Sequence, residues 1–135
     1  MTKKLRNKGF SLLELLVVIS IIGILIALGT AAFSTAQRKS RDAKRRGDVK
    51  SIQNAFEQYT ADNNGYGVSC AAMATSTYLP GGMPVDPQSG ASYSCGSSAS
   101  SYCVCATLEE AGSGNASDAG CTFGTGNYHC AVNLQ

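Results

Sequence analysis

Near its start the chain reads Lys8-Gly9-Phe10-Ser11-Leu12-Leu13-Glu14-Leu15-Leu16-Val17-Val18-Ile19, and the apolar run that begins there at Phe10 ends near Phe33. Glu14 is the only charged residue in that run. A carboxylate near the start of a membrane span costs about 3 kcal/mol or more, so it marks a functional site with a specific partner. The obvious partner is a new N-terminal ammonium, created by a cut after Gly9. Such a pair would tie one subunit to the next, which predicts a subunit of a filament.

All six cysteines lie beyond the apolar run. The whole chain has 135 residues, so roughly 70 to 75 remain for a globular head, which is small enough to need covalent staples. An even number of cysteines in a small Gly/Ser/Ala-rich module is typical of a disulfide framework formed in an oxidising compartment. We therefore predict that the head lies outside the cytoplasm and that its disulfides use Cys70, Cys95, Cys103, Cys105, Cys121 and Cys130.

Residues 1–9 are predicted to be a cytoplasmic leader peptide and residues 10–33 a membrane-spanning helix. The apolar run of roughly 24 residues can cross a bilayer core of ~30 Å as a helix. An ordinary signal peptide has a shorter apolar region, but the small residues 29–32 leave an ordinary signal cleavage as the alternative. Seven Lys and Arg residues follow the span and four precede it, which by the positive-inside rule favours a cytoplasmic head. The cysteines favour the opposite side, and we follow the cysteines.

Residues 34–64 are predicted to continue the same helix as an amphipathic segment. Apolar residues recur there at steps of three and four, which indicates a stripe that docks on the head. Asp42 and Arg46 are expected to form an i,i+4 pair on the exposed side. Gly65 is expected to end the helix as a left-handed cap. The stripe comprises Val49, Ile52, Phe56 and Tyr59, with Ala55 beside them.

The head, residues 65–135, is rich in turns and short of long periodic segments. Residues 78–87 form a loop punctuated by prolines. Residues 91–95, 101–108 and 128–132 have the composition of short strands, and residues 112–120 read as a loop of small residues. We predict an α+β fold in which the long N-terminal helix packs on an antiparallel sheet of three or four strands.

The stretch from Lys8 to Ile19 resembles the class III prepilin signal of type IV pilins and type II secretion pseudopilins, and the helix continuation resembles the same families less specifically. The resemblance implies a pilin-like fold and cleavage between Gly9 and Phe10 by a membrane-embedded prepilin peptidase. It also implies N-methylation of Phe10 and polymerisation into a helical homo-oligomer by an assembly platform and ATPase, with Glu14 as the assembly residue. Inner-membrane lipid would surround the span before assembly.

The chain departs from that pattern in the helix and matches it in one loop. Many type IV pilins carry a proline about where Ala31 stands, so the helix kink of that family is not expected here. Residues 83–90 resemble the Pro-x-Asp-Pro-x-x-Gly segment of major pseudopilins, which tend to bind calcium in a C-terminal loop. Asp86 and Asp118, with Glu109 and Glu110, supply oxygen ligands, but their spacing matches no known calcium cage. We expect no cofactor and keep calcium at Asp86 and Asp118 as the weaker alternative.

The disulfide pairing is left open by the sequence, because six cysteines allow 15 pairings. Cys103 and Cys105 lie two apart on an expected strand, so both sulfurs face one side and should have different partners. The resemblance favours Cys121 with Cys130, because many pilins close a C-terminal loop in this way. A zinc site with His129 as a fourth ligand is the alternative, but no Cys-x-x-Cys pair occurs. A thiol enzyme is equally unsupported, so no catalytic residue is predicted and His129 is expected at the surface.

The basic stretch from Arg38 to Lys50 has three interpretations. It is a solvated helix face near anionic lipid headgroups, or it packs against acidic heads of neighbouring subunits, or it binds DNA through phosphate attraction. Beyond Lys50 every formal charge is acidic, which favours the second interpretation over the third. Under it, neutralising Arg45 and Arg46 would weaken filaments at low salt.

The predicted function is therefore a non-catalytic structural subunit of a type IV pilus-like filament. The precursor would be a single-pass protein of the cytoplasmic membrane, and the filament would be extracellular or periplasmic. A major pseudopilin of a type II secretion system is the first alternative. A secreted disulfide-rich binding module, released from an ordinary signal, is the second.

Overall fold

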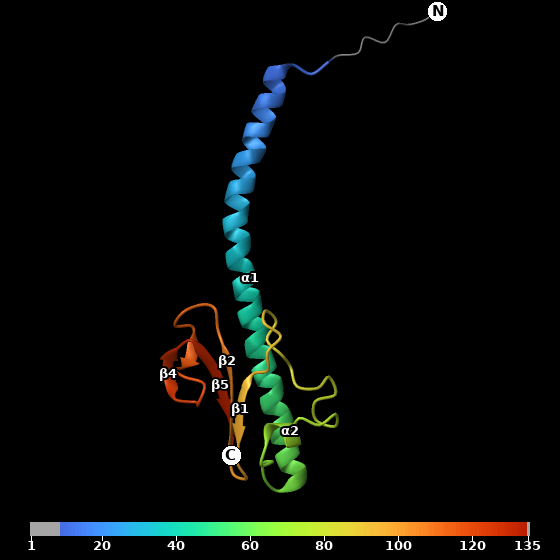
Figure 1. Cartoon of the computed structure of the whole chain (residues 1–135), viewed down its shortest axis with the longest axis vertical. Coiled ribbons are helices and arrows are strands. Elements are labelled where there is room, and N and C mark those ends of the chain that lie inside the picture. Colours follow the sequence, from blue (N-terminus) through green and yellow to red (C-terminus); the bar gives the residue numbers. More distant parts are fainter. Residues whose placement is uncertain (1–8, 135) are drawn as a thin grey trace, which may run out of the picture. The chain divides into compact units, whose positions relative to one another are not determined.

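The structure, a computed structural model, describes residues 9–134 (Figure 1). The chain divides into two compact units, residues 1–36 and 37–135. The leader predicted for residues 1–9 lies outside the described residues except for Gly9. The predicted α+β fold is confirmed: one long apolar N-terminal helix is followed by an antiparallel sheet.

Helix α1 spans Leu12–Asn63 without interruption. No proline occurs in this range, so every residue beyond the first turn can donate its backbone N–H to the helical ladder. Asn64 ends the helix with φ 55°, in the left-handed region. Gly65 has φ 158°, which is far from the left-handed helical value of about 57°, so the prediction that Gly65 supplies the left-handed cap is wrong. Asparagine takes this position because its short polar side chain tolerates the left-handed conformation better than most residues do.

The second unit contains a short helix and five strands. Helix α2 (Cys70–Met73) begins after Ser69, whose side chain accepts a hydrogen bond from the backbone N–H of Ala72. The strands are β1 (Ser94–Ser97), β2 (Tyr102–Thr107), β3 (Gly114–Ala116), β4 (Phe123–Gly126) and β5 (Tyr128–Val132). They form one sheet in the order β1-β2-β5-β3-β4, and all pairs are antiparallel.

The sheet has one strand more than the largest number predicted. Strand β4 lies in no segment that was predicted as a strand, and β3 forms where a loop of small residues was expected. Glycine makes this strand possible: a Cβ on Gly114 would lie 2.1 Å from the carbonyl oxygen of Tyr128, so any side chain would clash with the neighbouring strand. The side-chain amide of the adjacent Asn115 takes the place of a backbone peptide group in this pairing. It donates to the carbonyl of Cys130 (2.9 Å) and accepts from the backbone N–H of Cys130 (2.7 Å).

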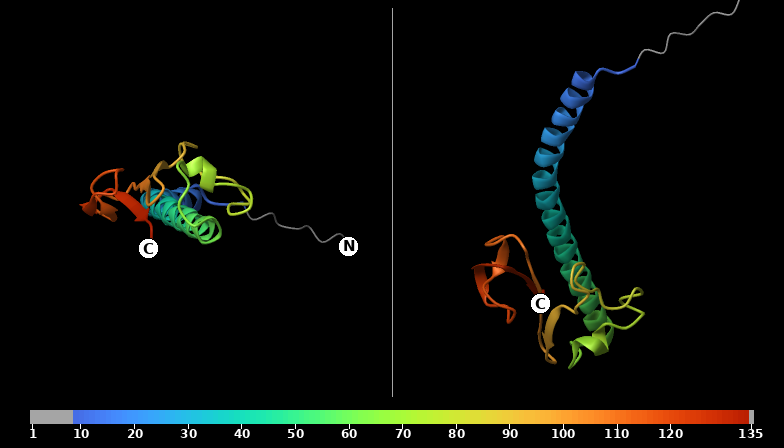
Figure 2. Two further views of the ribbon diagram at one scale, coloured as in Figure 1. Left: turned by 90° about the horizontal axis from the view of Figure 1, so that it is seen from below. Right: turned by 45° about the horizontal axis from the view of Figure 1, so that its top comes forward.

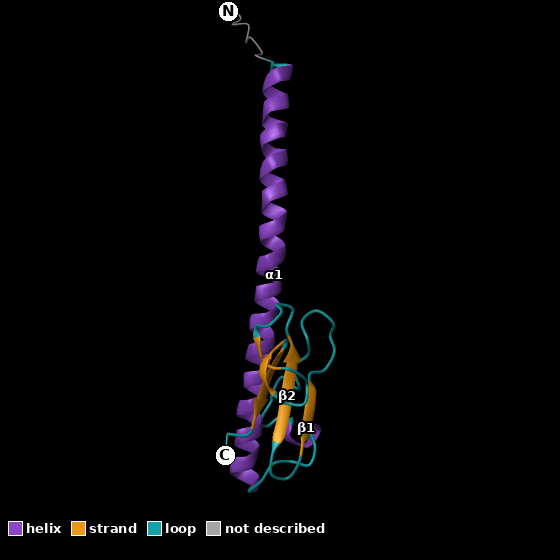
Figure 3. Cartoon of the chain, turned by 90° about the vertical axis from the view of Figure 1, so that its left-hand side faces the viewer, coloured by secondary structure: helices purple, strands orange, loops and turns teal. Residues whose placement is uncertain are grey.

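The two faces of the sheet carry two separate cores. One face packs on residues 37–63 of α1, and the strands run beside this part of the helix (Figure 3). Residues 66–92 lie on another side of the helix from the sheet (Figure 2). The predicted stripe is confirmed, because Val49, Ile52 and Phe56 are fully buried and Ala55 nearly so. Phe56 meets the ring of Tyr102 edge-on at 5.1 Å. The opposite face holds a smaller cluster around Cys105, Ala116 and Cys130.

Candidate assembly site

The segment Gly9–Glu14 begins the helix and forms its own N-terminal cap. The backbone N–H of Ser11 donates to Oε2 of Glu14 (2.9 Å), and the backbone N–H of Leu13 donates to Oγ of Ser11 (3.2 Å). This reciprocal arrangement is a capping box, in which a Ser and a Glu three residues later satisfy backbone donors that the first helical turn leaves free. The Ser-x-x-Glu spacing of residues 11–14 could have revealed it, but we considered Glu14 only as a partner for another chain.

Cleavage after Gly9 would leave Phe10 immediately before this cap. Gly9 and Phe10 are both exposed, and nothing lies within 4 Å of a Cβ built on Gly9. The peptide bond between them is therefore sterically open in the isolated chain. The cleavage, the methylation of Phe10 and the pairing of Glu14 with a neighbouring ammonium remain predictions.

The first unit exposes a continuous apolar helix surface. An 18-residue window of α1 has a mean hydropathy of 2.8 and none of it is buried, so the helix is long and apolar enough to cross a membrane. The hydroxyls in the run are satisfied within the helix, because Ser20 donates to the carbonyl of Leu16 (2.8 Å) and Thr30 to that of Ala27 (3.1 Å). Exposed apolar patches of this size mark a surface that lipid or protein covers.

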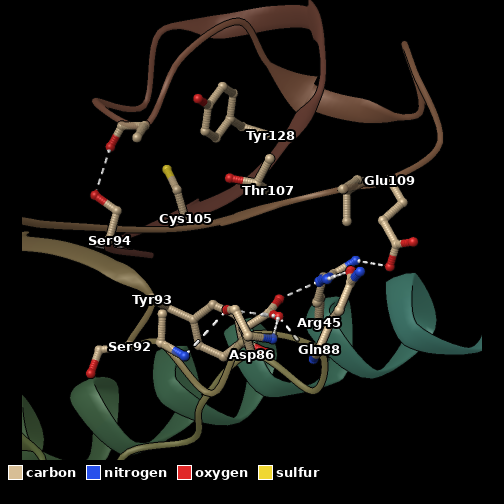
Figure 4. A pocket seen from close by; sticks show the side chains of 14 residues that line it. Arg45, Asp86, Gln88, Ser92, Tyr93, Ser94, Cys105, Thr107, Glu109 and Tyr128 are labelled. Carbon is tan, nitrogen blue, oxygen red and sulfur yellow. Dashed lines mark hydrogen bonds and ion pairs between the residues drawn. The ribbon is translucent and has the colours of Figure 1, made fainter. Parts of the chain in front are cut away.

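The second unit contains a network of charged side chains that the sequence did not predict (Figure 4). Arg45 is 4% exposed and lies among three carboxylates. It donates to Asp42 (2.8 Å), Asp86 (2.5 Å) and Glu109 (2.7 Å). Arg41 adds two hydrogen bonds of 2.6 Å to Glu109. The network joins α1 to the loop before β1 and to the segment after β2.

Asp42 has the most enclosed carboxylate of this network. Its side chain is 1% exposed and accepts from the backbone N–H groups of Glu109 (2.9 Å) and Glu110 (3.0 Å) as well as from Arg45. The predicted Asp42–Arg46 pair is therefore wrong: Asp42 pairs with Arg45 three residues on, and Arg46 donates to the carbonyl of Ser113 (3.0 Å). The interpretation of Arg38 to Lys50 as a solvated basic face is wrong for Arg45, which is buried, whereas Arg38, Lys39, Lys44 and Lys50 are exposed.

The network holds its carboxyl groups ionised. The guanidinium of Arg45 keeps the pKa of Asp86 well below its usual range, and that of Arg41 lowers the pKa of Glu109 to about 2. Burial acts to raise the pKa of Asp42, but the N–H groups of Glu109 and Glu110 together with the guanidinium of Arg45 outweigh it, so the pKa is lowered. Charge-assisted bonds of this kind stabilise the charged form of the acceptor.

A cavity of about 480 Å³ lies beside Arg45, Asp86 and Tyr93 (Figure 4). Its charged groups are already paired with one another, and Tyr93 donates to Asp48 (2.7 Å). Burial, followed by the hydrogen bond to Asp48, raises the pKa of Tyr93, which keeps its hydroxyl a neutral donor. The arrangement serves the fold by tying three segments together.

Glu57 forms a second polar centre on α1. Its carboxylate accepts from the hydroxyls of Tyr66 (2.9 Å) and Tyr102 (2.9 Å) and from the backbone N–H of Leu134 (3.0 Å). Burial and the nearby Glu57 raise the pKa of Tyr102, so this tyrosine remains protonated. The carboxylate thereby fastens the end of the chain to the helix.

The six cysteines form three disulfides: Cys70–Cys95, Cys103–Cys121 and Cys105–Cys130. The expectation that Cys103 and Cys105 have different partners is confirmed. The expected pair Cys121–Cys130 is wrong, because the β2–β5 register sets Cys105 directly opposite Cys130. Every cysteine is paired, so the alternative of a zinc site would require reduction first. The histidine beside them, His129, is half-buried rather than at the open surface, and burial lowers its pKa.

The two aspartates considered for calcium are held by N–H donors. Asp86 accepts from the backbone of Gln88 (2.9 Å) and Ser89 (2.8 Å) besides its pair with Arg45. Asp118 accepts from the backbone N–H of Gly120 (2.8 Å). Among residues 9–134, neither belongs to a group of three or more side chains placed to share a metal ion.

Comparison with known proteins finds a matching family model and several similar proteins. The family model described as "Prokaryotic N-terminal methylation motif" matches residues 4–30. The chain is similar to "Type IV wide pilus major component PilA4" of Thermus thermophilus, with 33% identity over 103 residues, which are 76% of this chain and 75% of that protein.

Shorter similarities involve two kinds of protein. "Type II secretion system core protein G" of Aeromonas hydrophila is 39% identical over 64 residues, 47% of this chain and 45% of that protein. "Type IV major pilin protein PilA" of Myxococcus xanthus is 33% identical over 61 residues, 45% of this chain and 28% of that protein. The chain thus matches less than half the length of these two relatives. No solved structure matches it.

Proposed function

The chain belongs to the family of type IV pilins and type II secretion pseudopilins, and from that premise we propose that it is a structural subunit of a type IV pilus-like filament. In this proposal a prepilin peptidase removes residues 1–9, Phe10 becomes the methylated N-terminus, and an assembly platform with its ATPase polymerises the mature chain through its apolar helix. The precursor stands in the cytoplasmic membrane, and the filament lies outside the cytoplasm.

The main support for this proposal is the apolar surface of the first part of α1, which is fully exposed in the isolated chain. This surface begins directly after the peptide bond between Gly9 and Phe10, which is sterically accessible. A filament core or a lipid bilayer would cover this surface. The three disulfides support a head in an oxidising compartment. The charges of Arg41 and Arg45 are neutralised by carboxylates within the head. These two residues therefore count less toward the positive-inside rule, which favoured a cytoplasmic head.

Glu14 has two roles in this proposal, and one substitution separates them. In the single chain its carboxylate caps Ser11. In the filament it would neutralise the ammonium of Phe10 from a neighbour, because each charge is costly to bury alone. Glutamine also serves at this position of a capping box, so Glu14→Gln keeps the cap and removes the charge.

The test is electron microscopy of filaments from cells expressing Glu14→Gln, with Ser11→Ala as the matched control. We expect Glu14→Gln to abolish or shorten filaments, while Ser11→Ala, which damages only the cap, leaves them intact at a cost of about 1 kcal/mol in the helix terminus. Normal filaments with Glu14→Gln would contradict the charge pairing. Mass spectrometry of the mature chain tests the processing separately: a methylated Phe10 supports the proposal, and a start near Ala32 would indicate a secreted module.

A pseudopilin of a type II secretion system remains the second candidate, favoured by the similarity to protein G of Aeromonas hydrophila. The pilus is preferred because the similarity to a pilus component extends over 76% of this chain. Deleting the gene distinguishes them: loss of surface filaments supports a pilus, whereas retention of secreted enzymes inside the cell supports a pseudopilus. Calcium at Asp86 or Asp118 and DNA as a ligand of the basic stretch from Arg38 to Lys50 remain further proposals, each testable by binding to the purified chain.

A further inference from the structure

Two disulfides share one face of the sheet and touch each other. Cys103–Cys121 and Cys105–Cys130 both lie on the face turned away from α1. The sulfur of Cys105 is 3.6 Å from that of Cys121 and 3.7 Å from that of Cys103, although it is bonded to neither. Figure 4 shows the Cys105 side chain on the same side of β2 as the ring of Tyr128. Four sulfurs thus form one contiguous cluster.

The two bonds differ in their access to solvent. Cys105 and Cys130 are 2% and 3% exposed, whereas Cys103 and Cys121 are both partly exposed. A dissolved thiol can therefore reach the Cys103–Cys121 bond more readily than the Cys105–Cys130 bond. Reaction rates of disulfides depend on such access.

Cys121 also sits on strained backbone. Its φ is 61°, a left-handed conformation that costs a residue other than glycine about 1–2 kcal/mol. The residue belongs to the turn 118–122 and to no strand, so it can move once its bond to Cys103 opens. Strained and exposed disulfides are the ones that exchange most readily.

We propose that these four cysteines form a thiol–disulfide relay, in which a low-molecular-weight thiol enters at Cys103–Cys121 and Cys121 opens the buried Cys105–Cys130 bond. In the first step the thiolate of the small molecule bonds to the sulfur of Cys103 and expels Cys121 as a thiolate. In the second step that thiolate bonds to the sulfur of Cys105, the Cys105–Cys130 bond breaks, and Cys130 leaves as a thiolate. Each step exchanges one disulfide for another, so no further oxidant or reductant is needed.

Cys121 is a better attacking group than Cys103. Residues two apart on a strand have Cα atoms about 6.6–6.8 Å apart, at the upper limit of what a disulfide can bridge. A Cys103–Cys105 bond would therefore have to distort β2, which is paired on both sides. Cys121 lies in a turn and can approach Cys105 without disturbing a strand.

The third disulfide provides a built-in control. Cys95 lies opposite Val104 in the β1–β2 register, so it faces the α1 side of the sheet with that fully buried residue. Cys70–Cys95 is thereby separated by the sheet from the other four sulfurs. A thiol released on that face has no second disulfide beside it.

The first experiment uses the full chain with Cys103→Ser, which leaves Cys121 without its partner, and Cys95→Ser as the control. Both variants are held near pH 8.5, where about half of an ordinary thiol is ionised, then trapped with N-ethylmaleimide and mapped by peptide mass spectrometry. We expect the label on Cys130 in about a tenth of the Cys103→Ser molecules or more, with a Cys105–Cys121 bond. In the control the label should stay on Cys70. A label confined to Cys121 would overturn the relay.

The second experiment guards against misfolding of that variant. Glutathione is added to the wild-type chain and to a chain with both Cys103→Ser and Cys121→Ser, and the opening of Cys105–Cys130 is followed by trapping. We expect this bond to open about tenfold faster or more in the wild type, because only there can Cys121 carry the exchange inward. An intact Cys70–Cys95 bond verifies the fold of both chains. Equal rates would overturn the relay.

Discussion

The two parts of helix α1 share one continuous backbone but differ in how far their apolar side chains are buried. Within residues 12–36, nearly every large side chain is apolar and exposed, as Phe33 at 65% illustrates. Within residues 37–63, one face is buried, and Phe56 is 0% exposed. Within residues 9–134 the apolar side chains of the first part are exposed, whereas the second part buries its apolar face against the sheet. One long helix can thus bury its apolar face within its own chain at one end and need lipid or other subunits to cover its apolar surface at the other.

Their charged residues differ in the same way. Glu14 is the only charge between Phe10 and Phe33, and its carboxylate accepts from the backbone N–H of Ser11. Asp42 and Arg45 are surrounded by partners from distant segments. Charges of the second part therefore contribute to the stability of the head, and under the proposed function the charge of the first part pairs with another chain.

The largest expected effect comes from matched phenylalanine substitutions in the two parts. Phe56→Ala removes a fully buried ring and should lower the free energy of unfolding of the head by about 3–5 kcal/mol. Phe33→Ala should change it by less than about 0.5 kcal/mol, because surface substitutions rarely do more. Urea unfolding of both variants in the same detergent measures the difference. Equal losses would show that the first part also contributes to the folding of the head.

Asp42→Ala is expected to come next. It leaves Arg45 without one partner and two backbone N–H groups of the Glu109 segment without an acceptor, and breaking a buried pair costs about 3 kcal/mol. Glu110→Ala, at an exposed neighbouring acidic residue, is the control and should cost less than about 0.5 kcal/mol. Thermal unfolding of the two variants compares them. A loss no larger for Asp42→Ala than for Glu110→Ala would mean that the network contributes nothing.

Acid should destabilise the head through the same network. The pKa of Glu109 falls from 4.5 to about 2 on folding, and the pKa values of Asp42 and Asp86 also fall. Between these values the unfolded chain binds more protons than the folded chain, so the free energy of unfolding decreases as the pH falls. The stabilisation should be complete above about pH 5 and disappear progressively from pH 4.5 toward pH 2 and below. Urea unfolding midpoints measured across this pH range test the prediction. The Arg41→Gln substitution should raise the pKa of Glu109 in the folded chain, so the stability that Glu109 contributes should be lost at a higher pH.

The sequence predicted the apolar part of this fold well because hydrophobic periodicity is local. The spacing of Val49, Ile52 and Phe56 is enough to define a buried face. The charged part was missed because its partners are distant: Arg45 lies 41 residues from Asp86 and 64 from Glu109. An i,i+4 rule applied to Asp42 considers only its own helix and cannot reveal such partners.

The disulfide pairing and strand β3 were also not predictable from local sequence patterns. That Cys103 and Cys105 have different partners follows from strand geometry, but which partners they have depends on the β2–β5 register, which composition does not determine. Gly114 was interpreted as a loop residue, although its missing side chain is what allows β3 to approach β5. The capping box of Ser11 and Glu14, in contrast, was readable from the sequence and was overlooked.

Glu57→Gln should have a smaller effect than Asp42→Ala. The amide still accepts hydrogen bonds, but without the negative charge it holds Tyr66, Tyr102 and the N–H of Leu134 more weakly. We expect a loss of about 1–2 kcal/mol, as is usual for hydrogen bonds to charged groups. Urea unfolding measures it, and hydrogen exchange at Leu134 should accelerate. An unchanged exchange rate at Leu134 would contradict the role of Glu57 in fastening the chain end.

The smallest expected effect is a gain in stability at the end of α1. Asn64 is exposed and left-handed, with φ 55°, and glycine adopts this conformation without a Cβ penalty. Asn64→Gly should therefore raise the free energy of unfolding by about 0.5 kcal/mol. Gly65→Ala is the complementary substitution: its φ of 158° is a conformation that residues with a side chain rarely adopt, and its Cβ would lie 3.4 Å from the carbonyl of Ala99, so this change should lower the free energy of unfolding by about 1 kcal/mol or more. Urea unfolding measures both variants, and a loss of stability with Asn64→Gly would show that the left-handed conformation of Asn64 carries no cost.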